Sequence, residues 1–252
     1  MRIAALYNIK GGVGKTSTAV NLAYLSAKHG RRTLLWDLDA QGAATYILRI
    51  KPRVKGGGKQ LVRATRPLED SLKGTDFDNL DLLPADFTYR HLDLLLDETK
   101  KPTRQLAKLL APLADEYDQV ILDCPPSMSL LSENVLRAAD LVLVPLIPTT
   151  LSVRTMEQLT HFVSGLDGPA PRLLGFFSMV DRRKTLHREI IAALPSQRGD
   201  IARAAIPALS VVEQMAQRRE PVPEFAPRSA AARSYEELWR EAFGEPPSRD
   251  YS

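Results

Sequence analysis

Cysteine is almost absent from this chain of 252 residues, since Cys124 is the only one. A single cysteine excludes disulfide bonds within the chain, and it cannot supply the pair of thiolates per subunit that a shared iron–sulfur cluster needs. Long apolar runs are also missing. The longest, such as residues 141–147, are far shorter than the roughly 20 residues that span a bilayer, and they are typical of buried parallel strands.

Acidic residues are missing from one stretch, residues 49–67, which also contains three consecutive glycines at 56–58. The basic residues of this stretch are Arg49, Lys51, Arg53, Lys55, Lys59, Arg63 and Arg66. We expect it to bury no core face. Two interpretations stay open: a flexible, solvated insertion without function, or a loop that contacts nucleic-acid phosphates, because lysine and arginine gain free energy by releasing counterions from DNA.

Glycine is concentrated in the run K-G-G-V-G-K-T at residues 10–16, which follows an apolar strand pattern at residues 3–7 and precedes a helical pattern. In a phosphate-binding loop, glycines let backbone N–H groups turn toward the phosphates, a lysine reaches the outer phosphates, and a hydroxyl ligates magnesium. Lys15 and Thr16 fill the last two roles. The ordinary spacing places glycine at position 9, where this chain has Ile9.

The run resembles the deviant Walker A motif of the ParA/MinD group of ATPases, whose additional lysine reaches the nucleotide of the partner subunit. The resemblance assigns that role to Lys10 and catalytic roles to Lys10 and Lys15. It implies a doubly wound α/β fold of the P-loop NTPase type, with a mostly parallel sheet covered by helices on both faces, and ATP and Mg²⁺ as cofactors. The implied nucleotide contacts are Gly11, Gly12, Val13, Gly14, Lys15, Thr16 and Ser17.

A second motif follows the next strand pattern. Residues 33–42 resemble the D-x-D-P-Q-G element of the same group, with Ala40 in place of the proline. Carboxylates at positions i and i+2 of a strand point the same way, so Asp37 and Asp39 are expected to face the phosphate pocket together. By resemblance, Asp39 orients the attacking water as a catalytic residue, and Asp37 supports magnesium through its water shell.

A third motif is the apolar strand pattern at residues 119–123, which ends in Asp123 and is followed by Pro125-Pro126. It is a Walker B pattern. Asp123 is expected to hold a magnesium-bound water, and the two prolines are expected to stiffen a segment that senses the terminal phosphate. The expected metal residues are therefore Thr16, Asp37 and Asp123.

The rest of the chain alternates strand and helix patterns, which is typical of a parallel sheet covered on both faces. We predict helices near 129–138, 152–164, 185–194, 211–218 and 231–243, and strands at 141–145, 173–180 and 204–206. The expected organisation is one ATPase domain over residues 1–244, with the possible insertion at 49–67, and a disordered tail at 245–252.

The resemblance implies a ParA-type partitioning ATPase of the short form, without an N-terminal helix-turn-helix. Such a protein turns over ATP slowly until a partner stimulates it, dimerises with ATP, binds nonspecific DNA in that state, and partitions or positions a DNA or protein cargo. The implied partners are a second copy, nonspecific double-stranded DNA and a ParB-like or other stimulating protein, in the cytoplasm and on the nucleoid.

An alternative is a nucleotide-switched regulatory protein that acts on a protein or membrane partner without DNA. A stable membrane anchor is disfavoured because the predicted last helix has a largely acidic polar face.

Members of this family that bind DNA have an arginine in a D-x-R pattern. The resemblance implies the same role for Arg183, which lies in Asp181-Arg182-Arg183. A second family arginine follows an Ile-Pro pair, but no basic side chain follows Ile206-Pro207 directly. The residues expected to contact DNA are Arg182, Arg183, Lys184, Arg218 and Arg219.

Overall fold

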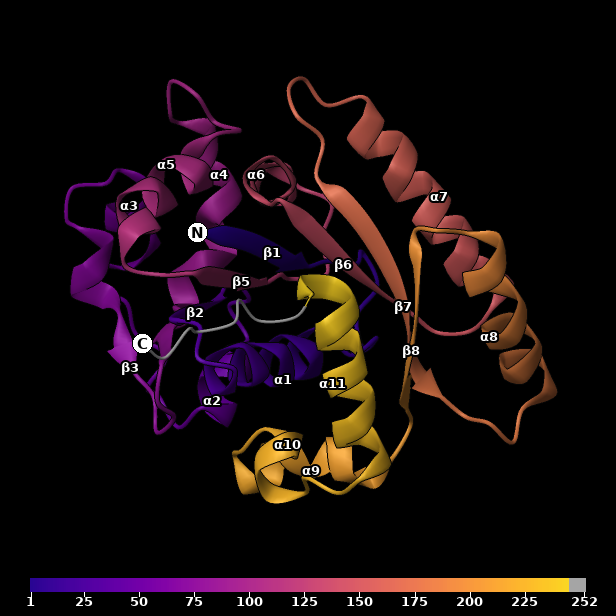
Figure 1. Cartoon of the computed structure of the whole chain (residues 1–252). Coiled ribbons are helices and arrows are strands. Elements are labelled where there is room, and N and C mark those ends of the chain that lie inside the picture. Colours follow the sequence, from indigo (N-terminus) through magenta and orange to yellow (C-terminus); the bar gives the residue numbers. More distant parts are fainter. Residues whose placement is uncertain (245–252) are drawn as a thin grey trace, which may run out of the picture.

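The computed structural model describes residues 1–244, which build one eight-stranded sheet between two layers of helices (Figure 1). The strand order is β3-β4-β2-β5-β1-β6-β7-β8, and every neighbouring pair is parallel except β3 with β4. The predicted doubly wound, mostly parallel fold is confirmed. The strands are β1 (Arg2–Leu6), β2 (Thr33–Asp37), β3 (Lys73–Gly74), β4 (Leu80–Leu83), β5 (Gln119–Asp123), β6 (Leu141–Leu146), β7 (Arg172–Val180) and β8 (Ile201–Pro207).

The helices divide between the two faces of the sheet according to the apolar cluster that each one joins. One face carries α1 (Lys15–Lys28), α2 (Ala43–Ile47), α9 (Ser210–Arg218), α10 (Val222–Phe225) and α11 (Ala230–Phe243). The other carries α3 (Gly57–Val62), α4 (Leu92–Asp97), α5 (Gln105–Leu110), α6 (Leu130–Ala138), α7 (Thr150–Ser164) and α8 (Thr185–Gln197). Three short 3₁₀ segments complete the connections: η1 (Leu68–Ser71), η2 (Phe87–His91) and η3 (Ala111–Asp115).

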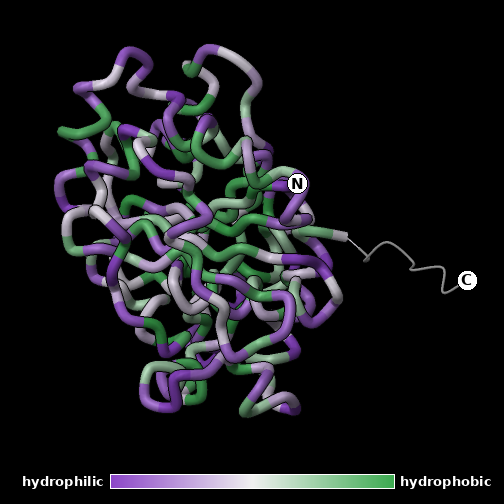
Figure 2. The backbone as a smooth tube through the Cα atoms, turned by 90° about the vertical axis from the view of Figure 1, so that its left-hand side faces the viewer, coloured by the Kyte–Doolittle hydropathy of each residue, from purple (hydrophilic) through white to green (hydrophobic). Residues whose placement is uncertain are grey.

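The central strands form because both of their faces are covered. All residues of β2, β5 and β6 are buried, as expected for parallel strands between two helical layers. Figure 2 shows the hydrophobic segments gathered in the interior and the hydrophilic ones in the outer turns. Within residues 1–244, no helix combines the length and apolar content needed to cross a bilayer.

The helices and strands predicted after residue 128 are all present, with ends that differ by a few residues. In contrast, the sequence analysis predicts no element between β2 and β5, where the structure has β4 and several short helices. Elements of four to six residues are too short to display a hydrophobic period, so tertiary packing decides their conformation. The predicted tail at 245–252 lies outside the described residues.

The expectation that residues 49–67 bury no core face is wrong. Val54, Leu61 and Val62 are buried in the same apolar cluster as α4 and α5. The Gly58 N–H donates to Thr88 Oγ1 at 2.7 Å and ties the start of α3 to η2. A few apolar residues on one side of a short helix are enough to anchor it, although its other residues are basic.

The packing of α3 is tested by Leu61→Ala. Truncating a buried leucine costs about 2–5 kcal/mol, and we expect a value near the lower end because α3 lies at the edge of the core. The neighbouring exposed Lys59→Ala is the control and should change stability by no more than about 0.5 kcal/mol. Urea unfolding followed by circular dichroism measures both, and equal stability of the two variants would contradict the packing described here.

Candidate functional site

The three motifs meet at the carboxyl edge of the sheet because of the register of its central strands. Asp123 at the end of β5 lies opposite Leu6 of β1 on one side and opposite Asp37 of β2 on the other. The glycine-rich loop leaves β1 directly after this point and ends where α1 begins at Lys15. In open α/β sheets, ligands bind beyond the carboxyl ends of such strands.

The loop turns on two glycines whose backbone is left-handed, Gly12 with φ 69° and Gly14 with φ 88°. A Cβ atom on Gly14 would lie 2.7 Å from Ser178 Oγ, so both conformation and space exclude a side chain there. The loop therefore needs glycine at position 14, immediately before α1, where backbone N–H groups are free for an anion.

Lys15 is buried, and its ammonium group stays inside its own loop. Nζ donates to the carbonyl oxygens of Asn8 at 3.1 Å and Lys10 at 2.9 Å. Burial lowers the pKa of Lys15, and the nearby Asp123 acts in the opposite direction. Asn8, which belongs to none of the sequence motifs, links the loop to β6. Its Oδ1 accepts from the Lys10 N–H at 2.9 Å, and its Nδ2 donates to the Pro145 carbonyl at 2.8 Å.

The Asp123 carboxylate is completely buried, and neither oxygen has a hydrogen-bond partner in the described part of the chain. Burial and the charge of Asp37 raise the pKa of Asp123 well above its ordinary value. A buried carboxylate without a partner is costly, and a hard cation with its water shell satisfies such oxygens. Together with the Thr16 hydroxyl, which lines the adjoining pocket, this donor set fits Mg²⁺.

Residues 1–244 hold no group of three or more histidine, cysteine, aspartate and glutamate side chains suited to a metal ion. The Thr16 hydroxyl and the Asp123 carboxylate suit a cation that is held partly by water and by nucleotide phosphates, which is how magnesium is commonly bound.

Asp37 and Asp39 do not face the pocket together, which corrects the sequence prediction. Strand β2 ends at Asp37, so the alternation of a strand does not extend to Asp39. Asp37 Oδ2 accepts from Thr45 N at 2.8 Å and Thr45 Oγ1 at 2.7 Å, and its Oδ1 accepts from Asp39 N at 3.2 Å. Burial raises the pKa of Asp37 to about 6. These bonds fix the turn that presents Asp39, which alone of the two lines the pocket.

Lys10 lies on the outer side of the loop, in contrast to Lys15. It is exposed, as are Gly11, Gly12 and Pro126, and it forms no ion pair with any residue of 1–244. Pro126 lies beside the loop, since a Cβ atom on Gly11 would be 3.9 Å from its Cγ. This side of the site is therefore open to another molecule.

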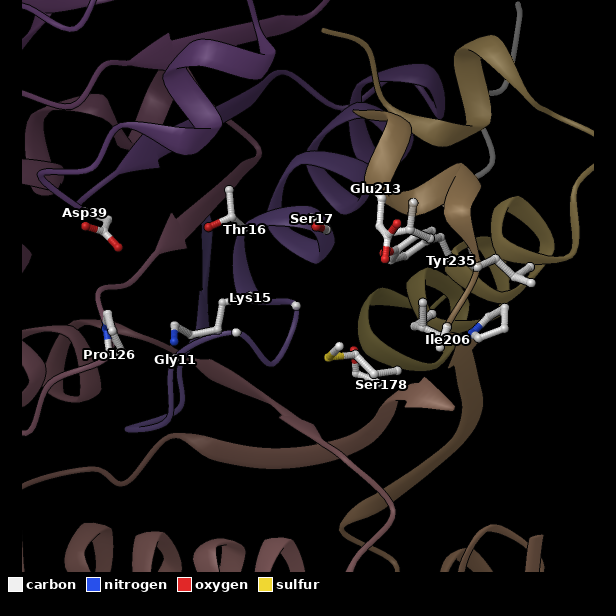
Figure 3. Close-up of a pocket in the computed structure, with 17 residues that line it drawn as sticks. Gly11, Lys15, Thr16, Ser17, Asp39, Pro126, Ser178, Ile206, Glu213 and Tyr235 are labelled. Atoms are coloured by element: carbon white, nitrogen blue, oxygen red, sulfur yellow. The ribbon is translucent and has the colours of Figure 1, made fainter. Parts of the chain in front are cut away.

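A pocket of about 370 Å³ runs from the glycine-rich loop to the ends of β7 and β8. Figure 3 shows Asp39 and Pro126 at one end of it, Lys15, Thr16 and Ser17 in the middle, and Ile206, Glu213 and Tyr235 at the other end. The lining at that far end is Met179, Ile206, Pro207, Ala208, Leu209, Val212, Glu213 and Tyr235.

The far end is mostly apolar with a carboxylate among its lining residues, which suits a flat base and a hydroxylated sugar. The sequence analysis missed these residues because they come from loops after two late strands and from two helices, with no shared motif. The backbone at Met179 is left-handed, with φ 55°, and the pairing of β7 with β8 shifts register between Phe177 and Val180. Such irregularities gather at functional sites.

The 182–184 loop, one of the two places predicted to contact DNA, follows β7. Arg183 forms a bidentate ion pair with Asp181, Nε to Oδ1 at 2.9 Å and Nη2 to Oδ2 at 3.0 Å. The pair lowers the pKa of Asp181 to about 2, so the charge of Arg183 is partly compensated. Arg182 and Lys184 are exposed.

Arg218 and Arg219, the other predicted place, end α9 beside α2. Arg219 Nε donates to the Tyr46 carbonyl at 2.9 Å, and its guanidinium lies 4.6 Å from the centroid of the Tyr46 ring. Arg218 lies 5.0 Å from the centroid of Phe225. No hydrogen bond or ion pair within residues 1–244 links this pair to the 182–184 loop.

Comparisons with known proteins agree with this geometry. Residues 1–169 match a family model described as an AAA domain. The chain is 38% identical over 198 residues to the chromosome partitioning protein ParA of Myxococcus xanthus, covering 75% of this chain and 69% of that protein. It is 31% identical over 246 residues to the sporulation initiation inhibitor protein Soj of Bacillus subtilis, covering 95% and 97%.

Two solved structures share the fold. A Cyanothece McdA variant in complex with ATP matches with a TM-score of 0.81 and 21% identity, covering 97% of this chain and 96% of that one. Cobyrinic acid a,c-diamide synthase from Mycobacterium smegmatis, with a bound ATP analogue and magnesium, matches with a TM-score of 0.79 and 27% identity, covering 98% and 97%.

The unpartnered carboxylate gives a direct prediction for Asp123→Asn. Without nucleotide, the variant should be about as stable as the wild type, because an amide of the same shape replaces a carboxyl group whose charged form is disfavoured by burial. It should lose the additional stabilisation that magnesium gives to the ATP complex, which for a wild-type site at 100 times its Kd amounts to about 2.7 kcal/mol. Thermal unfolding with ATP, with and without magnesium, measures this, with the exposed Asp97→Asn as control. A magnesium-dependent shift retained in Asp123→Asn would contradict the assignment.

Proposed function

The chain belongs to the ParA-type partitioning ATPases of the ParA/MinD superfamily, and on that premise we propose that it is an ATP-driven dimer switch. Membership makes it an ATPase that uses ATP with Mg²⁺ in a partitioning or positioning role. The proposal adds that the ATP-bound dimer binds nonspecific double-stranded DNA and that hydrolysis releases it, so that a DNA or protein cargo is moved.

The contrast between the two lysines of the loop carries this proposal. Lys15 is buried and bonded to its own loop, whereas Lys10 is exposed and has no ion pair within residues 1–244. Lys15 thus contacts the nucleotide of its own subunit. Lys10 is placed to contact the nucleotide of a second subunit.

Electrostatics explains why such a lysine couples ATP to dimerisation. Two ATP molecules face to face carry several negative charges at short range, and their repulsion opposes association unless cations lie between them. Lys10 from each subunit supplies such a cation. A cation provided in trans at a phosphoryl transfer site is worth about 10³–10⁵ in rate, or about 4–7 kcal/mol of barrier.

The other residues of the site take the following proposed roles. Residues 11–17 bind the phosphates, and Thr16 and Asp123, supported by Asp37, hold Mg²⁺, which neutralises charge on the phosphate oxygens when bound. Asp39 orients the attacking water, and the N–H of Gln41, which donates to Asp39 Oδ1 at 3.0 Å, fixes the direction of that carboxylate. The apolar far end of the pocket receives the adenine base.

A ParB-like or other stimulating protein completes the proposed cycle, which takes place in the cytoplasm on the nucleoid. A membrane anchor built from the last helix does not fit, because its apolar residues are already used inside the fold. Tyr235, Leu238 and Trp239 are buried, and Trp239 Nε1 donates to Ser26 Oγ of α1 at 2.8 Å.

Alanine substitutions at Lys10 and Lys15 distinguish the roles of the two lysines. Lys10→Ala should bind ATP with the affinity of the wild type and remain monomeric, because only the cation between the two nucleotides is lost. Lys15→Ala should lose ATP binding. Titration with a fluorescent ATP analogue and analytical ultracentrifugation measure both, with the exposed Lys100→Ala as control. A dimer of normal stability in Lys10→Ala with ATP would refute the role assigned to Lys10.

DNA binding is tested with Asp39→Ala, which should bind ATP but hydrolyse it slowly. We expect retention on nonspecific DNA with ATP and not with ADP, and stronger retention in the variant because its dimer persists. The logarithm of the affinity should fall with the logarithm of salt concentration by about 0.9 per phosphate contacted. If no nucleotide state binds DNA, the alternative of a switch that acts on a protein or membrane partner takes its place.

A further inference from the structure

Positive charge is unevenly distributed along this chain. The formal net charge is +4, yet residues 49–67 alone carry seven positive and no negative side chains. The rest of the chain is therefore net negative. We therefore expect the surface around residues 49–67 to attract a polyanion more strongly than the rest of the protein does.

The segment is held in place rather than loosely attached. Asp86, at the start of η2, accepts from the Val54 N–H at 2.9 Å through Oδ2, and through Oδ1 from the Thr88 N–H at 2.9 Å. Gly56 has φ 80° and Gly57 has φ 65°, so the chain makes a left-handed turn here before α3. The turn lies next to η2, since the Gly58 N–H donates to Thr88 Oγ1 at 2.7 Å.

Residues of η2 extend the basic surface and add an aromatic ring. Phe87 is 65% exposed, and the Arg90 guanidinium lies 4.0 Å from the centroid of its ring. We call Lys51, Arg53, Lys55, Lys59, Phe87 and Arg90 the basic lobe. Each of them is exposed, and none of its cations forms an ion pair within residues 1–244.

Two other cations of the segment are already paired. Arg49 pairs with Glu220 at 2.6 Å, and Arg63 pairs with Glu98 at 3.2 Å. The 182–184 loop and the end of α9 have arginines bound to Asp181, Tyr46 and Phe225, as described above. Within residues 1–244 the basic lobe thus has five cations without an ion pair, whereas the 182–184 loop has two, Arg182 and Lys184, and the end of α9 has two, Arg218 and Arg219.

Hydrogen bonds also connect the basic lobe to the nucleotide site. Thr45 Oγ1 donates to Asp37 Oδ2 at 2.7 Å and accepts from the Ala85 N–H at 2.8 Å. Asp37 in turn holds the Asp39 turn, and Asp86, next to Ala85, holds residue 54 of the lobe. A continuous set of buried contacts therefore runs from the water-orienting aspartate to the base of the lobe.

We infer that the basic lobe is the principal DNA-contacting surface of this protein. The inference rests on the proposed function and gives it a location. Four flexible lysine and arginine side chains around a glycine turn suit the phosphates of any DNA sequence, and an arginine stacked on an exposed ring adds a stiff, planar donor. The lobe and the 182–184 loop lie at opposite ends of the sheet, with α3 and α8 on opposite sides of Figure 1.

Nonspecific DNA fits better than an anionic membrane. Phe87 is the one apolar side chain of the lobe, and the Arg90 guanidinium lies over one face of its ring. Membrane surfaces are bound by helices with a wide apolar face, whereas the apolar residues of α3, Leu61 and Val62, are buried in the core. Charge without an apolar face is the usual composition of a phosphate-binding surface.

The test compares two triple charge reversals in the Asp39→Ala background with ATP. Arg53→Glu/Lys55→Glu/Lys59→Glu removes the lobe, and Arg182→Glu/Arg183→Glu/Lys184→Glu is the matched control at the other end of the sheet. We expect the lobe variant to bind DNA at least tenfold more weakly and to lower the salt slope by about 0.9 for each phosphate that it no longer binds. The control should change affinity less than threefold. ATP-dependent dimerisation of both verifies folding, and glutamine replaces glutamate if a variant fails this check.

Each result is decisive. A loss of DNA affinity confined to the 182–184 variant overturns the placement and leaves the proposed DNA binding intact. Absence of DNA binding by the parent protein, with normal ATP-dependent dimers, overturns both proposals. Sedimentation of the parent with phosphatidylglycerol vesicles, abolished in the lobe variant, together with weak DNA retention overturns the inference in favour of a membrane surface.

Discussion

The backbone register of β5 against β1 and β2 is the constraint on which the whole site depends. It places Leu6, Asp123 and Asp37 in one row across the sheet. The glycine-rich loop leaves one end of this row, and the Asp39 turn leaves the other. A shift of one residue in any of these strands would turn its side chains to the opposite face of the sheet and separate the carboxylates from the loop. Burial of these strands on both faces prevents such a shift, so the packing of the core determines the geometry of the site.

The same row concentrates charge in a buried place. Asp37 and Asp123 lie opposite one another, and burial raises the pKa of both. Asp37 is compensated by three hydrogen bonds, whereas Asp123 is not. A buried acceptor without a hydrogen-bond partner favours the binding of a cation at this place.

The parallel sheet and the glycine-rich loop between β1 and α1 could be predicted from the sequence, because short strand patterns end in particular side chains. The prediction that Asp37 and Asp39 face the pocket together was wrong, because β2 already ends at Asp37. Sequence reasoning also failed where packing between distant segments decides. The apolar end of the pocket joins β7, β8, α9 and α11. The burial of Val54 and Leu61 depends on η2 and α4, and the orientation of Asp37 depends on Thr45 in a helix of five residues. None of these contacts produces a hydrophobic periodicity or a motif that can be recognised in the sequence.

The central claim is that Lys10 acts on the nucleotide of the other subunit, and mixing two inactive variants tests it most directly. Lys10→Ala keeps its own Asp39 but gives no lysine to its partner, while Asp39→Ala gives the lysine but cannot orient water. In a mixed dimer, the Lys10→Ala subunit has both groups at its site. The mixed dimer keeps one of the two lysines between the nucleotides, and we expect the mixture to hydrolyse ATP faster than either variant alone, at no more than about half of the wild-type rate because each mixed dimer has one complete site of two. If analytical ultracentrifugation shows mixed dimers but the mixture is no more active than the separate variants, Lys10 does not act in trans and the central claim is contradicted.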